Sequence, residues 1–268
     1  MSTEVSAHVS RSGRAYDLAR AALDLDRRAW LVCSGRLGRM PEQGPAGFGP
    51  AMALDIINAA SLTGFFPTGP IDFSPDHVDV EAFEDCLRVV TRTTWHGEPY
   101  LECQMGFAAN GQVGMALTRS GRFVDHLIGS SSVLLTDLET LIVDTMILLD
   151  AAATYHDLRG PCHVVADVLC ALPGEPLRLC TLDSLSGGRP SPGRPVGDFR
   201  PVVLDYRDDL DSGAGHAVVW QAFLAAAAQF GAAEPQYLPS PEWGTPWEAS
   251  RTGRNAPVLR GDRAGAAG

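Results

Sequence analysis

The residues of this sequence with the clearest chemical potential lie between positions 32 and 41. The segment reads Val-Cys-Ser-Gly-Arg-Leu-Gly-Arg-Met-Pro, so Cys33 is followed by five residues and then by Arg39. At this spacing a cysteine thiolate and an arginine guanidinium can face the same phosphate group. Backbone N–H groups of the intervening residues complete such a phosphate-binding loop. The spacing therefore makes Cys33 a candidate nucleophile and Arg39 a candidate phosphate ligand.

The same ten residues resemble the start of the low-molecular-weight tyrosine phosphatases and arsenate reductases, which carry the pattern V-C-x-G-x-x-x-R-x-P. The resemblance implies a phosphatase-like or arsenate reductase-like enzyme. Two features depart from that family: Met40 stands where it has a serine that assists the thiolate, and no Asp-Pro dipeptide is present to supply its general acid. The alternative interpretation is the end of a strand followed by a loop, because residues 34–50 are rich in glycine and proline.

Other kinds of site chemistry have little support. All 21 basic residues are arginines, so neither a lysine Schiff base nor a Walker-type phosphate loop can form. The seven histidines lack metal-ligand spacing, and none of the six cysteines belongs to a C-x-x-C pair. We therefore expect no metal site and no cofactor.

Two aromatic segments are candidates for binding a protein partner. Phe65 and Phe66 belong to a loop that is interrupted by prolines, over residues 64–75. Tyr237, Trp243 and Trp247 lie in a tail that is rich in proline, glycine and alanine. Tryptophans in such a tail can anchor a segment in the groove of another protein. The alternative is that these aromatic side chains pack on their own domain.

The net charge of −11 argues against a general attraction to nucleic acid or to anionic membranes. The N-terminus has no apolar signal region, and the longest apolar run carries several acidic residues. We therefore expect a cytoplasmic bacterial protein that does not enter membranes. Its partner is expected to be another protein, and a homo-oligomer is compatible with the sequence.

A long helix is predicted over about residues 136–158. Thr136 and Glu139 have the spacing of a capping box, and the Gly-Pro pair at 160–161 predicts the end of the helix. The residues between these signals are mostly apolar, which is typical of a buried helix. A narrow polar stripe of Asp137, Thr140 and Asp144 is predicted to face solvent.

Alternating apolar residues from position 87 onward predict a meander of antiparallel strands, with a hairpin turn at Asn110-Gly111. Further strands are expected at 122–128, 162–172, 177–182 and 202–206, and further helices at 15–28, 51–62 and 215–230. The predicted fold class is α+β: an antiparallel meander sheet packed against the long central helix, with flanking N- and C-terminal helices.

The expected domain organisation is a flexible N-terminus at 1–12, a single domain at 13–232 and a mostly disordered tail at 233–268. The glycine- and proline-rich segment 186–197 is a loop or a boundary within the domain. With no strong catalytic constellation, the favoured function is a non-catalytic intracellular regulatory, adaptor or chaperone-like protein that acts through protein–protein contacts. The alternatives are the phosphatase-like enzyme and a small-molecule-binding domain.

Overall fold

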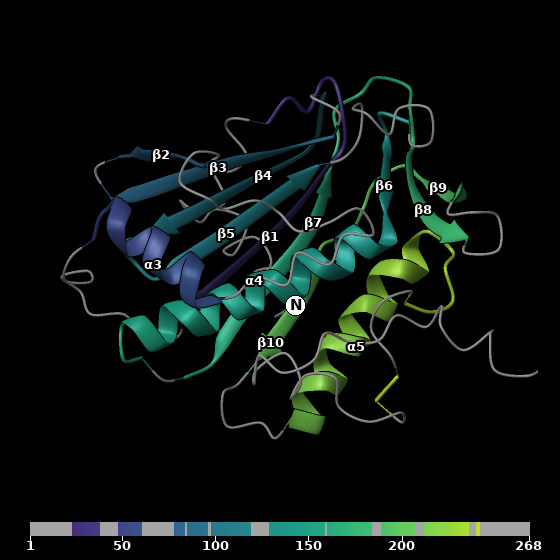
Figure 1. The fold of residues 1–268 in the computed structure, drawn as a ribbon. Coiled ribbons are helices and arrows are strands. Elements are labelled where there is room, and N and C mark those ends of the chain that lie inside the picture. The colour runs from purple at the N-terminus through teal and green to yellow at the C-terminus, as the bar shows by residue number, and fades with distance from the viewer. Residues whose placement is uncertain are drawn as a thin grey trace, which may run out of the picture.

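A computed structural model describes residues 23–37, 48–60, 78–83, 85–95, 98–118, 129–158, 160–183, 189–206, 212–235 and 240–241. These residues form a large antiparallel sheet with three helices on one face and a small sheet beside it (Figure 1). The predicted α+β class, with its long central helix and flanking helices, is confirmed. No helix among the described residues is long and apolar enough to cross a membrane.

The large sheet has the strand order β10-β7-β1-β5-β4-β3-β2. Its strands are β1 (Trp30–Leu37), β2 (Val78–Ala82), β3 (Cys86–Trp95), β4 (Glu98–Ala108), β5 (Gln112–Thr118), β7 (Cys162–Leu169) and β10 (Val202–Tyr206). The small sheet has the order β6-β8-β9, with β6 (Ser132–Leu134), β8 (Leu177–Asp183) and β9 (Arg189–Val196). The helices are α3 (Pro50–Ala60), α4 (Leu135–Tyr155) and α5 (Ser212–Gln229).

The predicted meander corresponds to β3, β4 and β5, which pair in succession. Gly111 has a φ of 79° in the turn between β4 and β5. The side chain of Asn110 accepts a hydrogen bond from the N–H of Gln112, 3.1 Å away. Asparagine and glycine are both suited to such a turn, which is why the sequence predicted this hairpin well. The strand predicted at 122–128 lies outside the described residues.

Strand β1 is the largest correction to the sequence analysis. Residues 34–37 were expected in a loop, but they continue β1 through the middle of the sheet. Arg36 pairs with Gln112 of β5 on one side and with His163 of β7 on the other. Gly35 supports close packing rather than a turn: a Cβ at this position would collide with the side chain of Leu149 on α4. Both neighbouring strands come from distant parts of the chain, so the local sequence could not reveal this pairing.

Helix α4 lies across the sheet where the central helix was predicted, but its end signals differ. The predicted capping box does not form: no side chain caps the N-terminus of α4, and Thr136 lies inside the first turn of the helix. At the C-terminal end, Asp157 has a φ of 51°, and the N–H of Leu158 donates to the carbonyl of Ala153 at 2.8 Å. The helix therefore ends in a left-handed cap made by an aspartate, three residues before Gly160.

The polar stripe of α4 does not face solvent. Asp137, Thr140 and Asp144 are each at most 2% exposed. The hydroxyl of Thr140 donates to the carbonyl of Thr136 at 2.8 Å, one turn earlier in the helix. The narrow stripe was correctly identified as a break in an apolar helix, but the inference that it faces water is wrong.

The C-terminal elements agree more closely with the sequence. Strand β10 has the predicted bounds, and Gly231, with a φ of 77°, follows the end of α5. The segment 186–197 differs because it contains β9, which pairs with β8 despite its three prolines. Proline is tolerated there because β9 lies at the edge of its sheet.

Candidate functional site

Cys33 lies in the interior of the protein, in the middle of β1. It pairs with Met115 on one side and with Ala166 on the other, and it is 0% exposed. Burial raises the pKa of its thiol to about 12, so the thiol is protonated at neutral pH. A phosphatase nucleophile requires a thiolate that substrate can reach. The environment of Cys33 therefore does not favour a catalytic role.

The other predicted site residues, Arg39, Phe65, Phe66, Tyr237, Trp243 and Trp247, lie outside the described residues. The proposed contact between Arg39 and a phosphate therefore remains a prediction. The backbone that follows Cys33 is fully described as far as Leu37, and it forms a strand. Because its peptide groups are directed at the neighbouring strands, they are not arranged to surround a phosphate.

A buried polar network lies on the face of the sheet opposite the helices. Arg28 donates to Asp24 at 2.6 Å and to Glu102 at 3.3 Å, and its guanidinium lies 5.1 Å from the centre of the Trp30 ring. Gln104 donates to Glu102 at 3.0 Å. Because these groups bind one another, the network stabilises the sheet and leaves little capacity for a ligand. In the described part of the chain, no group of three or more histidine, cysteine or acidic residues could hold a metal.

The clearest candidate site is a groove between α5 and β10, which we call the α5–β10 groove. Strand β10 is at the edge of the large sheet, and among the described residues only β7 pairs with it. The groove is open, with a volume of about 750 Å³, within the usual range of ligand-binding sites. It is lined by residues 200–205 of the strand segment and by Ala217, Val218, Gln221, Ala222, Ala225 and Gln229 of α5.

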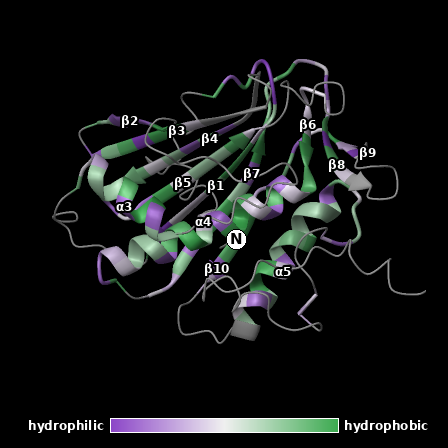
Figure 2. Cartoon of the chain, viewed as in Figure 1, coloured by the Kyte–Doolittle hydropathy of each residue, from purple (hydrophilic) through white to green (hydrophobic). Residues whose placement is uncertain are grey.

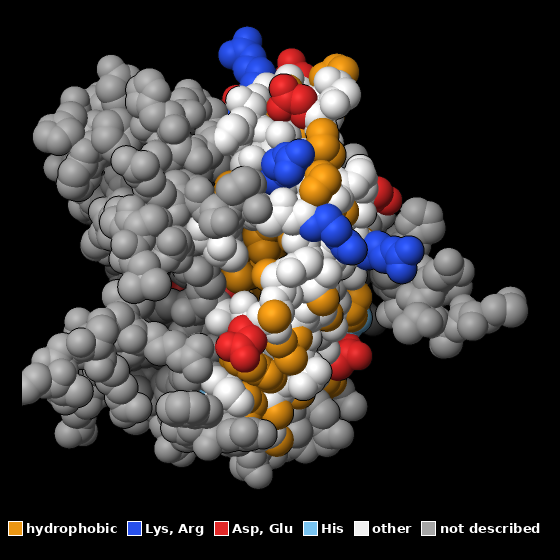
Figure 3. Space-filling model, turned by 90° about the vertical axis from the view of Figure 1, so that its right-hand side faces the viewer, with side chains coloured by type: hydrophobic (Ala, Val, Ile, Leu, Met, Phe, Trp, Pro, Cys, Tyr) orange, Lys and Arg blue, Asp and Glu red, His pale blue; other side chains and the backbone are white. Residues whose placement is uncertain are grey.

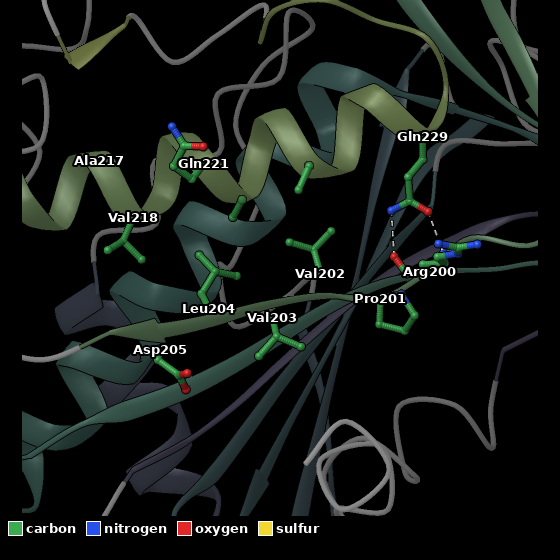
Figure 4. A pocket seen from close by; sticks show the side chains of 12 residues that line it. Arg200, Pro201, Val202, Val203, Leu204, Asp205, Ala217, Val218, Gln221 and Gln229 are labelled. Atoms are coloured by element: carbon green, nitrogen blue, oxygen red, sulfur yellow. Dashed lines mark hydrogen bonds between the residues drawn. The ribbon is translucent and has the colours of Figure 1, made fainter. Parts of the chain in front are cut away.

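Successive side chains of β10 point to opposite faces of the sheet. Val202 and Leu204 point toward α5 and are buried, whereas Val203 points away from α5 and is 41% exposed (Figure 4). On the helix, Ala225 is an exposed lining residue with a very small side chain. The groove thus has an apolar floor and a roof that leaves room for bulky apolar side chains.

Gln229 closes one end of the groove. Its side-chain carbonyl accepts a hydrogen bond from the N–H of Arg200 at 2.7 Å, and its amide nitrogen donates to the carbonyl of Arg200 at 2.8 Å (Figure 4). A neighbouring β-strand would make the same pair of hydrogen bonds. Gln229 therefore satisfies the strand edge at Arg200, and among the described residues no strand pairs with this edge of β10 from Val202 onward.

Among the described residues that line the groove, the charged ones lie at its two ends. Arg200 lies at the closed end, where the exposed Arg194 donates to the carbonyl of Gln229 at 3.0 Å. At the other end, the side chain of Asp205 is 81% exposed and lies 2.6 Å from His163 of β7. Asp205 is thus a hydrogen-bond partner of His163. Between these ends the described lining residues are apolar except for Gln221.

Helix α5 is unusual for a helix with an exposed side. Its 18 residues include no aspartate, glutamate, lysine or arginine. It is green or pale over most of its length in the hydropathy view (Figure 2). In the space-filling view, hydrophobic side chains gather in the lower half of the face that carries α5, and arginines lie in the upper half (Figure 3). A surface helix normally has a charged outer face, so this surface is suited to contact with another apolar surface.

This groove was not predicted from the sequence, although one signal was present. The run of alanines and the absence of charge in 215–230 could have indicated a helix that is covered on more than one side. The partner strand of the groove could not be identified, because its edge position depends on the order of strands in the sheet.

The comparisons give no family to which this groove could be related. No family model matches the chain, and no curated protein matches its sequence significantly. The site must therefore be interpreted from its own geometry.

Proposed function

We propose that this protein is a non-catalytic regulatory, adaptor or chaperone-like protein that acts through protein–protein contacts, and that it binds a segment of its partner in the α5–β10 groove. The observation that carries the proposal is an open apolar groove between an edge strand and a helix without charged residues. Apolar surface that is exposed in one protein is stabilised when another protein covers it. The chemical environment of Cys33 supports the non-catalytic part of the proposal.

The proposal is tested by blocking the groove without disturbing the core. Ala225 and Ala228 are both exposed residues of α5, but only Ala225 lines the groove. Ala225→Arg places a long charged side chain in the groove, and Ala228→Arg is the matched control on the same helix. Alanine and arginine have similar helix propensities, so both variants should fold, as circular dichroism can verify.

The affinity-tagged full chain and both variants are incubated with a lysate of the cells that produce the protein, and the bound proteins are quantified. We expect at least one protein to be retained by the parent chain and by Ala228→Arg but lost from Ala225→Arg. That protein is then purified and tested for direct binding. If Ala225→Arg and Ala228→Arg retain the same proteins in the same amounts, the groove is not the contact site and the proposal is wrong.

A further inference from the structure

We propose that the α5–β10 groove binds one extended segment of a partner protein as an eighth strand of the large sheet, paired with β10. This inference rests on the proposed function and specifies its partner. The segment carries apolar residues at alternate positions and a basic residue opposite Asp205.

The backbone groups of β10 determine which of its residues can pair with an added strand. The N–H and C=O of one residue point to the same side of an antiparallel strand, and this side alternates along the chain. Both groups of Arg200 are directed at Gln229, on the groove side. The corresponding groups of Val202 and Leu204, two and four residues later, therefore point into the groove. An incoming strand can exchange hydrogen bonds with both residues.

The space beside β10 and beneath α5 is wide enough for one added strand. Helix α5 packs chiefly on β10, with a smaller contact to α4. A helix is about 10–12 Å across with its side chains, whereas neighbouring strands are only about 4.8 Å apart. Helix α5 therefore extends over the position of one added strand. A single extended segment fits beneath it.

The same dimensions argue against a second copy of this chain as the occupant. If β10 paired with β10 of another copy, the two α5 helices would lie over adjacent strands. Packed helices need about 8–10 Å between their axes, which is more than the spacing of two strands provides. The partner must therefore present a strand that carries no helix on this face.

Pairing with β10 determines in which direction each side chain of the segment points. Antiparallel pairing continues the pattern of β10 with β7. Residues opposite Val202 and Leu204 then point toward α5, where the alanines of the roof leave space for large apolar side chains. The residue opposite Asp205 is basic, and its side chain points away from α5, as those of Asp205 and Val203 do (Figure 4). Directly opposite charges across a pair of strands stabilise the pairing modestly.

A fluorescein-labelled peptide, Thr-Arg-Leu-Thr-Leu-Glu with an amidated C-terminus, provides the probe. Its arginine is placed opposite Asp205 and its two leucines opposite Leu204 and Val202. Binding to the full chain is measured by fluorescence anisotropy. A peptide in which this arginine is replaced by glutamate should bind about fivefold more weakly, because the favourable charge pair with Asp205 becomes a repulsive one. Ala225→Arg should weaken binding of the original peptide by tenfold or more, and Ala228→Arg should not change it more than about twofold.

Two N-methylated peptides test strand pairing itself. The first leucine, opposite Leu204, donates its N–H to β10, whereas the N–H of the second threonine, opposite Val203, points away. Methylation of the leucine nitrogen should reduce affinity at least tenfold, and methylation of the threonine nitrogen should have a small effect.

Equal loss with both N-methylated peptides, or no binding of the parent peptide at millimolar protein, would overturn the strand-addition inference. The proposed function is judged separately, by the proteins that distinguish Ala225→Arg from Ala228→Arg. A partner that depends on Ala225 but does not bind as a strand would preserve the function and refute the inference.

Discussion

Replacement of Gly35 by alanine tests the packing of β1 under α4, where the sequence predicted a loop. A Cβ at position 35 would overlap the Cδ1 atom of Leu149 and lie 3.1 Å from Cγ2 of Val164. Leu149 is 1% exposed and Val164 is 0% exposed, so neither side chain can move freely away. Overpacking of a core typically costs about 1–3 kcal/mol.

The expected net effect is smaller than this cost. Alanine restricts the unfolded chain more than glycine does, which stabilises the folded state by about 0.4–1 kcal/mol. We therefore expect Gly35→Ala to lower the free energy of unfolding by about 1–2 kcal/mol. Urea denaturation followed by far-ultraviolet circular dichroism measures this change. Gly197→Ala is the control, because a Cβ at Gly197 would meet no atom within 4 Å.

A double-mutant cycle tests whether the contact with Leu149 causes the destabilisation expected for Gly35→Ala. Leu149→Ala alone should cost about 2–5 kcal/mol, because it leaves a cavity above β1. In that background the methyl group added by Gly35→Ala enters the vacant space, so the second change should cost little or nothing. The coupling should be about 1–2 kcal/mol. If Gly35→Ala were as stable as Gly197→Ala, position 35 would lie in an accommodating loop, and the phosphate-loop interpretation of Cys33 would regain its basis.

Two further predictions concern Cys33 and Gln229. Burial raises the pKa of Cys33 from 9.0 to about 12, so only the unfolded state loses the thiol proton between these pH values. This contribution to the free energy of unfolding is fully present below pH 9 and falls by about 1.4 kcal/mol for each pH unit above pH 9. In urea titrations, the free energy of unfolding of Cys33→Ala should therefore decline less steeply with pH than that of the parent chain. Gln229→Ala removes both hydrogen bonds to Arg200 and should cost about 1 kcal/mol in the same assay, whereas Gln221→Ala, on the exposed side of α5, should change stability by less than about 0.5 kcal/mol. An unchanged pH slope in Cys33→Ala, or equal effects of the two glutamine variants, would contradict these explanations.

The parts of the fold that the sequence predicted well depend on neighbours in the chain. The hairpin at Asn110-Gly111 joins β4 and β5, which are adjacent in both sequence and space. Strand β10 was also recognised from local signals, and the helix predicted at 215–230 corresponds to α5. Alternation, turn residues and helix-ending glycines act over a few residues, and they can therefore be identified in one sequence.

Strand β1 shows why the remainder could not be predicted. Leu31 pairs with Leu117 and with Val168, which are separated from it by 86 and 137 positions. The glycine at position 35 indicated a loop locally, but in the sheet it accommodates Leu149. The burial of Asp144 within α4 has the same origin, since the polarity of a residue does not determine which other segments pack over it.

The candidate site was still harder to predict, because it arises where a strand edge and a helix meet. The features that make this groove suitable for one strand also protect it from uncontrolled pairing. Exposed edges of sheets tend to pair with other copies, and proteins commonly prevent this with prolines, short strands or covering elements. Here Pro201 precedes β10, the side chain of Gln229 hydrogen-bonds the backbone of Arg200, and α5 extends over the outer edge of β10. These features block another sheet of the same construction, yet they leave the backbone of Val202 and Leu204 accessible to a single segment. The proposed selectivity for an isolated strand therefore follows from how the edge is protected.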